Sequence, residues 1–254
     1  MMAWRAAPVL GVRDVPAAVE HYQSMLGFEC PGGMYGPENE RVYAVMRRDG
    51  IEVHLQIRRR NVWAAARGSY ERSAYLYCPD VDSLHEALRS AGALVAPPPT
   101  DMPYGNREVV LSDQDGHRLA FGVDLGRAES AWETAPVLGC RDVEAAMSWF
   151  VDTLGFSCPG GLFTPPDHEP VYAIVFREGA GVHLQIRRRP VFLAERQAHE
   201  GDAYLFVTDP DALHEEYAAK GVTIIRPPQD EPYGLRDFTI EAPTGHRLTF
   251  ARDS

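Results

Sequence analysis

Two copies of one short motif carry the side chains of this sequence that are best suited to chemistry. Residues 53–60 read Val-His-Leu-Gln-Ile-Arg-Arg-Arg, and residues 182–189 repeat them unchanged. Because successive side chains of a β-strand point to opposite faces, the histidine, the glutamine and the first arginine share one face of the strand. A neutral imidazole suits a general base or a ligand contact, and it also occurs in cores, hydrogen-bonded to backbone carbonyls. The candidates are His54 and His183, for ligand binding or catalysis, and Gln56 and Gln185, for ligand binding.

Aromatic residues with the same alternation form a second group. Aromatic walls with a few polar groups are typical of small-molecule pockets, and flat rings favour planar ligands, although an ordinary sheet core is the alternative. A Pro-Tyr-Gly loop follows in each half, and loops at the rim of a sheet often bind ligands. The strand candidates are Tyr75 and Tyr77 after Ser73, and Tyr204 and Phe206 after Asp202. The loop candidates are Tyr104, Arg107, Tyr233 and Arg236.

These motifs belong to an internal repeat that spans the chain. Ala-Pro-Val-Leu-Gly occurs at residues 7–11 and 135–139, and Gly-His-Arg-Leu at residues 116–119 and 245–248. The repeat predicts two homologous domains. Their predicted bounds are residues 1–124 and 135–254, with a polar linker over residues 125–134.

Each half repeats once more in a weaker form. Four aspartates each precede a helical pattern of apolar residues, and a glycine follows 12 or 13 residues after each aspartate. Aspartate caps a helix N-terminus and glycine ends a helix, while the segments between these patterns alternate like short strands. The sequence therefore predicts an α+β fold of four βαβββ units. The aspartates are Asp14, Asp80, Asp142 and Asp209.

The remaining histidines have simpler interpretations. His117 and His246 follow glycine and are expected in turns. His85 and His214 lie on predicted helices beside a glutamate, and we expect them at the surface.

Composition and charge limit the classes of function. With 254 residues, 45% hydrophobic residues and a formal charge of −11, the chain has the balance of a globular protein. The acidic excess disfavours nucleic-acid binding, and no apolar run approaches the ~20 residues that span a bilayer. The N-terminus lacks the apolar stretch of a signal peptide, and four cysteines are too few for a disulfide framework. We expect a cytoplasmic protein with no nucleic-acid and no membrane partner.

The order of the motifs resembles that of the vicinal oxygen chelate superfamily, which includes glyoxalase I, bleomycin-resistance proteins and extradiol dioxygenases. The matching segments are residues 10–14, 26–28 and 113–119, each with a counterpart in the second half. The resemblance implies two cup-shaped mixed sheets, with helices on the outer faces and the ligand in the cup. It also implies an intramolecular pseudo-dimer of the two halves, within a monomer or a homodimer.

The resemblance also bears on metal binding, because many members hold a divalent ion with His, Glu or Gln from several strands. A catalytic metal usually needs three protein ligands, and alanine has no donor atom. We therefore expect neither a metal nor another cofactor, and His183 and Asp202 are the remaining candidates for a divalent ion. The family positions fall on Ala7, His54, Ser73 and Ala120, and on Ala135, His183, Asp202 and Thr249.

Two functions fit these features. The first is a glyoxalase/bleomycin-resistance-like protein that binds a small, planar or aromatic molecule in the sheet cups without a catalytic metal. The alternative is an enzyme of the same superfamily, a lyase, isomerase or dioxygenase, with a reduced metal site or a histidine general base. The sequence leaves open which ligand is bound, what charge it carries and whether one or both halves are functional.

Overall fold

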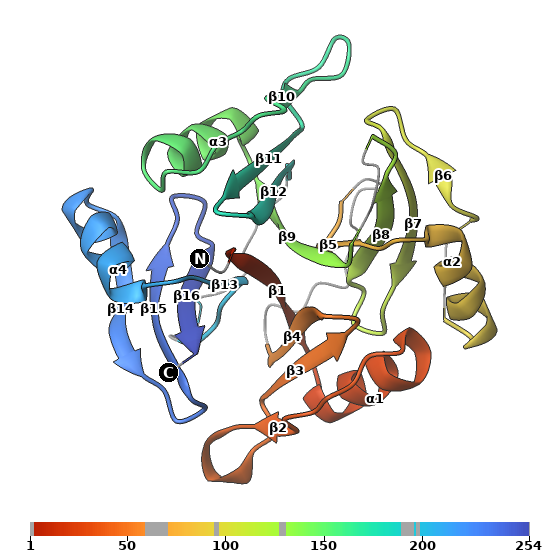
Figure 1. The fold of residues 1–254 in the computed structure, drawn as a ribbon, viewed down its shortest axis with the longest axis horizontal. Coiled ribbons are helices and arrows are strands. Elements are labelled where there is room, and N and C mark those ends of the chain that lie inside the picture. Colours follow the sequence, from red (N-terminus) through yellow and green to blue (C-terminus); the bar gives the residue numbers. More distant parts are fainter. Residues whose placement is uncertain are drawn as a thin grey trace. The chain divides into compact units, whose positions relative to one another are not determined.

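The computed structural model describes residues 3–58, 71–93, 97–126, 131–188, 196 and 199–253 of the chain. It confirms the predicted α+β fold, because four βαβββ quarters follow one another along the sequence (Figure 1). Arg59, Arg60 and Arg189 of the basic motif lie outside the described residues. Among the helices that the structure describes, none has the length and apolar character needed to cross a membrane.

The four quarters have the same element order. The first holds β1 (Arg5–Val12), α1 (Val15–Leu26), β2 (Met34–Tyr35), β3 (Tyr43–Arg48) and β4 (Ile51–Ile57). The second holds β5 (Ala74–Tyr77), α2 (Val81–Ser90), β6 (Thr100–Asp101), β7 (Asn106–Ser112) and β8 (Arg118–Asp124). The third holds β9 (Glu133–Cys140), α3 (Val143–Asp152), β10 (Leu162–Phe163), β11 (Tyr172–Arg177) and β12 (Ala180–Ile186). The fourth holds β13 (Ala203–Phe206), α4 (Pro210–Ala219), β14 (Thr223–Asp230), β15 (Leu235–Glu241) and β16 (Arg247–Asp253).

The helices begin where the aspartates predict. The Asp14 carboxylate accepts a hydrogen bond from the Ala17 backbone N–H over 2.9 Å, and the other three aspartates cap their helices in the same way. Gly27 follows α1 directly in the left-handed conformation, with φ of 69°. The later helices end two or three residues before their glycines, which are also left-handed.

The strands form two curled, mixed sheets of eight strands each. The strand orders are β14-β15-β16-β13-β1-β4-β3-β2 and β10-β11-β12-β9-β5-β8-β7-β6. In every quarter the first strand runs parallel to the last, and the last three strands pair with one another antiparallel. This order confirms the predicted pair of cup-forming sheets.

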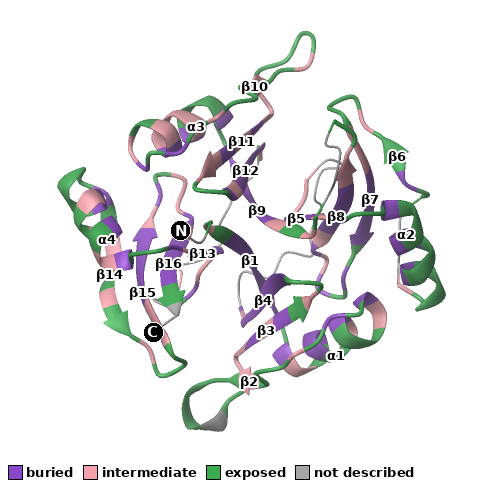
Figure 2. Cartoon of the chain, viewed as in Figure 1, coloured by how far each residue is buried: buried purple, intermediate pink, exposed green. Residues whose placement is uncertain are grey.

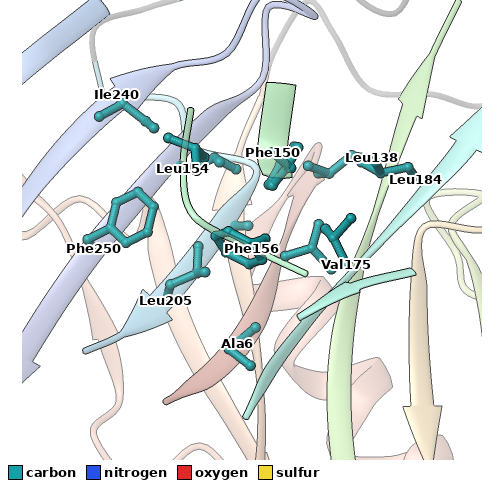
Figure 3. Close-up of a cluster of buried hydrophobic side chains, with 14 of the residues drawn as sticks. Ala6, Leu138, Phe150, Leu154, Phe156, Val175, Leu184, Leu205, Ile240 and Phe250 are labelled. Carbon is teal, nitrogen blue, oxygen red and sulfur yellow. The ribbon is translucent and has the colours of Figure 1, made fainter. Parts of the chain in front are cut away.

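The chain divides into two compact units, and each has its own hydrophobic core. The N-terminal unit is Pro8–Thr134, and the C-terminal unit is Ala135–Ser254 together with Met1–Ala7. In the C-terminal unit, Phe150 and Leu154 from the α3 region pack with side chains from β11, β13 and β16 (Figure 3). Burial follows the strands and the inner sides of the helices in both units (Figure 2).

Alternation along β4 separates two faces. Val53 and Leu55 are fully buried in the core beneath the helices, as predicted. His54 and Gln56 lie on the opposite face. That opposite face, present in all four quarters, carries most of the candidate residues.

Candidate functional site

Each motif histidine is buried and hydrogen-bonded to a tyrosine of the neighbouring strand. His54 on β4 is 3% exposed, and its Nδ1 lies 2.6 Å from the Tyr43 hydroxyl on β3. His183 on β12 is 1% exposed, and its Nδ1 lies 2.7 Å from the Tyr172 hydroxyl on β11. In both pairs the rings meet edge to face, with centroids 5.6 Å apart. The Nδ1 partner is therefore a tyrosine hydroxyl rather than a backbone carbonyl.

The surroundings of the two histidines differ. In the N-terminal unit, Glu52 Oε2 lies 3.6 Å from His54 Nε2, and Arg47 donates a hydrogen bond to Glu52 Oε1 over 2.8 Å. The repeat places Gly181 at the position of Glu52. Burial lowers the pKa of His183 to about 3, so this imidazole is neutral at neutral pH. One histidine thus has a carboxylate beside it, and the other has a glycine at that position.

The motif arginines pack across glycines of the neighbouring parallel strands. Arg58 is 4% exposed, and a Cβ added to Gly11 would lie 2.3 Å from the Arg58 Cδ. A Cβ on Gly139 would lie 2.8 Å from the Arg187 Cδ. Glycine is needed at both positions because a side chain would displace the arginine. Gln56, which is level with Gly11, is buried on this same face.

The predicted aromatic face lies on β5, beside two small residues of β8. Tyr75 is level with Ala120, and Tyr77 is level with Gly122. On the other side of β8, Gly122 is level with Glu108 of β7. The rings of Tyr75 and Tyr77 are 4.7 Å apart between centroids. Two tyrosines and a carboxylate therefore share the face opposite the helices.

Glu108 contributes a buried carboxylate to the face that carries Tyr75 and Tyr77. It is 5% exposed, and Arg72 donates a hydrogen bond to its Oε1 over 3.3 Å. Asn106 donates a hydrogen bond to the Tyr75 hydroxyl over 2.8 Å. Burial, followed by the negative charge of Glu108, raises the pKa of Tyr75 and of Tyr104 well above the usual tyrosine range. Both hydroxyls are therefore protonated, and all three tyrosines lie near the carboxylate.

The equivalent carboxylate of the C-terminal unit, Asp237, is fully buried. Its Oδ2 accepts hydrogen bonds from Tyr204 and, over 3.0 Å, from Tyr233. Its Oδ1 accepts from the Arg226 guanidinium. Burial raises the pKa of Tyr233 to about 12. Both oxygens of this carboxylate have protein donors.

A cation also covers the aromatic ring of the C-terminal cluster. The Arg5 guanidinium carbon lies 3.5 Å from the ring centroid of Phe206, the counterpart of Tyr77. This distance fits a cation–π contact. The rings of Tyr204 and Phe206 are 5.6 Å apart. The aromatic candidates of the two halves therefore have different neighbours.

The loop arginines lie away from the face opposite the helices. Arg107 makes two hydrogen bonds to Asp82 of α2, of 2.8 and 2.9 Å, and one of 2.8 Å to Asp101 of β6. Arg236 repeats this arrangement with Asp211 and Asp230. Both arginines connect a helix to an edge strand. The loop tyrosines Tyr104 and Tyr233 are about half exposed, at 48% and 49%.

Several of the family's metal positions hold side chains that have no donor atom or that already have protein partners. Ala7 and Ala120 offer no donor atom. Asp202 Oδ2 accepts a hydrogen bond from Arg196 over 2.6 Å and from the Arg247 backbone N–H over 2.9 Å. Across the described ranges, no group of three or more His, Cys, Asp or Glu side chains is arranged to hold a metal ion.

The structure corrects the expected surface position of His85, whereas His214 is half-buried. His85 is buried, 7% exposed, because it falls on the apolar stripe of α2 with Leu84 and Leu88. The ring of His214 packs on Phe238, with centroids 5.5 Å apart. In the turn before β8, His117 Nε2 lies 2.7 Å from the Gly11 carbonyl oxygen.

Sequence reasoning missed four residues of these clusters. Tyr43 and Tyr172 each stand 11 positions before their histidine, and that shared spacing in both halves was an available signal. Glu108 and Asp237 are equivalent acidic residues inside apolar strands, where a charge is unusual. Both pairs were visible only by comparing the halves of the repeat.

The chain belongs to the glyoxalase/bleomycin resistance protein/dioxygenase superfamily. A model of that family matches residues 5–121 and again residues 134–250. The two matches agree with the duplicated fold and with the equivalent polar faces described above.

Individual relatives are similar in fold or in part of the sequence. Glyoxalase I from Zea mays is 15% identical, with a TM-score of 0.68 over 98% of this chain and 92% of that chain. A putative dioxygenase from Bacillus subtilis is 12% identical, with a TM-score of 0.65 over 100% and 85% of the two chains. Uncharacterized protein Rv0887c from Mycobacterium tuberculosis is 25% identical over 122 residues, 46% of this chain and 72% of that protein. At these identities the two structures show a common fold.

Proposed function

We propose that the protein binds a small, planar or aromatic molecule in the sheet cups and that it does so without a catalytic metal. The observation that carries this proposal is the cluster of Tyr75, Tyr77 and Tyr104 near the buried carboxylate of Glu108. Binding sites for small molecules combine aromatic surface with a few polar groups that fix orientation. The cluster offers both within the N-terminal unit.

The N-terminal cluster is the better candidate of the two. In the C-terminal unit, Arg5 covers the Phe206 ring and Arg226 binds Asp237. A cation of the protein therefore already lies on the aromatic ring, and both oxygens of Asp237 already have donors. Tyr77 in the N-terminal unit has the equivalent ring position.

The remaining expectations extend the proposal. We propose a small-molecule ligand, no cofactor, and neither a nucleic-acid nor a membrane partner. The cytoplasmic location and the intramolecular pseudo-dimer, as a monomer or a homodimer, remain predictions from the sequence. His54, Gln56, His183 and Gln185 remain predicted ligand contacts.

One arrangement supports the enzymatic alternative. Tyr43, His54 and Glu52 form a consecutive chain of contacts, of 2.6 Å and 3.6 Å, in which a proton could move between neighbouring groups. His183 fits a general base poorly, because its pKa of about 3 makes it a weak base. Turnover of any substrate should therefore be lost in His54→Gln and retained in His183→Gln.

Direct binding measurements test the main proposal. We would titrate the wild-type protein with quinoline, acridine and N-methylindole, and repeat the titrations with Tyr77→Leu. Loss of one aromatic stacking partner should weaken binding by about threefold to tenfold. Phe206→Leu is the matched control, and its affinities should equal those of the wild type. Equal affinities in all three proteins would contradict the assignment of the ligand to this cluster.

Metal analysis tests the second part of the proposal. After dialysis against Zn²⁺, Mn²⁺, Fe²⁺ or Ni²⁺ and removal of free ions, untagged protein should retain far less than one ion per chain by mass spectrometry. One tightly held ion per chain would contradict the proposal, and His183→Ala and Asp202→Ala would then show whether these residues hold it.

A further inference from the structure

One atom of the tyrosine–carboxylate cluster distinguishes the N-terminal unit from its repeat. The side chain of Glu108 is 3% exposed, and Arg72 binds its Oε1. Its Oε2 is buried and has no partner of good hydrogen-bond geometry among the described residues, and the Tyr75 and Tyr104 hydroxyls lie close to the carboxylate. A buried carboxylate oxygen without a donor is unfavourable, because burial removes the water that would otherwise bind it.

Comparison with the C-terminal unit shows which residues differ around this oxygen. In the C-terminal unit, the Tyr204 hydroxyl donates to Asp237, and the strand residue two positions before Asp237 is Leu235, which has no polar group. In the N-terminal unit that position is Asn106, and its amide donates to the Tyr75 hydroxyl over 2.8 Å. The Tyr75 hydroxyl therefore accepts a hydrogen bond from this amide, whereas its counterpart Tyr204 has no such amide at position 235 and donates to the carboxylate.

The acceptor lies beside an aromatic surface. Glu108 is level with Gly122, and Gly122 is level with Tyr77, so only a residue without a side chain stands between carboxylate and ring. A Cβ at Gly122 would lie 2.2 Å from the Tyr75 hydroxyl. The aromatic rings and the Glu108 Oε2 acceptor therefore lie on one face of three neighbouring strands.

From this geometry we infer that Glu108 Oε2 is a specificity-determining acceptor for a planar aromatic molecule that carries an N–H or O–H donor. The inference rests on the proposed function and narrows its ligand class. Arg72 already offsets the charge of the carboxylate, so a neutral donor satisfies the site, and a protonated amine is the second source of the same hydrogen bond.

A matched pair of probes tests the inference on the unmodified protein. Indole has one N–H donor, and N-methylindole has the same ring without it. Indole should bind the wild type about tenfold more tightly, the difference expected for a hydrogen bond to a charged group. Tryptamine, whose ammonium group adds a cation, distinguishes the sources: tighter binding than indole assigns the site to protonated amines, and equal or weaker binding assigns it to neutral donors.

Two substitutions complete the test. Glu108→Leu removes the acceptor, and Asn106→Leu keeps it but removes the amide that orients the Tyr75 hydroxyl, so that this hydroxyl can turn and donate to the carboxylate as Tyr204 does in the C-terminal unit. Both should bring the affinity ratio of indole to N-methylindole close to one. Asp113→Asn alters a buried carboxylate elsewhere in the same unit and should keep the wild-type ratio. Thermal unfolding would establish that each variant is folded.

The outcomes separate this inference from the proposed function. A wild-type ratio near one, with both probes bound, overturns the donor requirement and leaves the aromatic site standing. A ratio that persists in both folded variants also overturns it, because another acceptor must then be responsible. If neither probe nor any other planar aromatic molecule binds the wild type, the proposed function itself is wrong.

Discussion

At the scale of single residues, burial sets the chemistry of the two histidine pairs. Tyrosine hydroxyls hold His54 and His183 at Nδ1, and the imidazole of His183 is almost completely buried. Burial disfavours the charged form, and this fixes His183 as a neutral hydrogen-bonding group. A buried histidine of this kind makes stability depend on pH.

The pH dependence has a definite sign. The unfolded imidazole of His183 has a pKa near 6.5, and the folded one about 3, so the unfolded state binds more protons between these values. The free energy of unfolding should fall as the pH drops from 6.5 toward 3, by about 1.4 kcal/mol per pH unit for this group. Urea titrations should show a shallower fall in His183→Gln than in the control His168→Gln, which alters an exposed histidine. Equal slopes would contradict the assignment.

Removing a tyrosine hydroxyl tests the pairs directly. Tyr172→Phe leaves His183 Nδ1 buried without this partner, so we expect a loss of about 1–3 kcal/mol in the free energy of unfolding. Tyr35→Phe, at a position 39% exposed, should change it by less than about 0.5 kcal/mol. Chemical denaturation of both variants is the measurement. A neutral effect of Tyr172→Phe would show that the hydrogen bond contributes nothing net.

The position and partners of a side chain were predictable from the sequence only where a pattern within one element specifies them. The face shared by His54 and Gln56 follows from alternation within one strand. The partner of His54 lies across a hairpin, and the ion pairs of Arg107 come from a helix and an edge strand. Contacts between elements depend on register and tertiary packing, which one strand does not specify.

At the scale of elements, the boundaries were largely predictable because their signals are local. An aspartate that caps its own helix and a glycine that leaves it in the left-handed conformation act within a few residues. The apolar stripe of α1 is buried as its period predicts. The error at His85 came from weighing polarity above position, since this residue occupies the buried stripe of α2.

At Gly122, strand β8 lies so close to Tyr75 of β5 that an added side chain should destabilise the protein. Gly122→Ala would place a methyl group 2.2 Å from the Tyr75 hydroxyl, so the ring or the strand must shift. We expect a loss of about 1–3 kcal/mol in the free energy of unfolding. Gly160→Ala, with no atom of the described residues within 4 Å of the added Cβ, should be nearly neutral. Thermal unfolding of both variants measures the difference, and equal stability would contradict the packing at Gly122.

At the scale of the whole molecule, duplication gave two clusters that have diverged. Among the described residues, Tyr204, Tyr233 and Arg226 donate to the carboxylate of Asp237, whereas Arg72 donates to that of Glu108. Four aligned positions contribute to the change in hydrogen bonding: Asn106 against Leu235, Glu108 against Asp237, Arg72 against Gly201 and Pro97 against Arg226. We interpret the C-terminal cluster as structural and the N-terminal cluster as the ligand site.

This division predicts unequal costs for equivalent substitutions. Asp237→Asn replaces a fully buried carboxylate, bound by Arg226, with a neutral amide. We expect a loss of about 3 kcal/mol in the free energy of unfolding. Glu108→Gln should cost less, about 1 kcal/mol, because fewer protein donors depend on it. Urea unfolding of the two variants compares them. A larger loss for Glu108→Gln would reverse the assignment of roles.

We propose that the N-terminal tyrosine cluster binds planar aromatic molecules. The most direct test of this proposal is a nuclear magnetic resonance titration of protein with labelled tyrosine rings, with indole and quinoline as probes. We expect the ring resonances of Tyr75, Tyr77 and Tyr104 to shift together and to saturate with one dissociation constant. The resonances of Tyr204 and Tyr233 should remain unchanged. Saturable shifts confined to other tyrosines, or no shifts at any probe concentration, would contradict it.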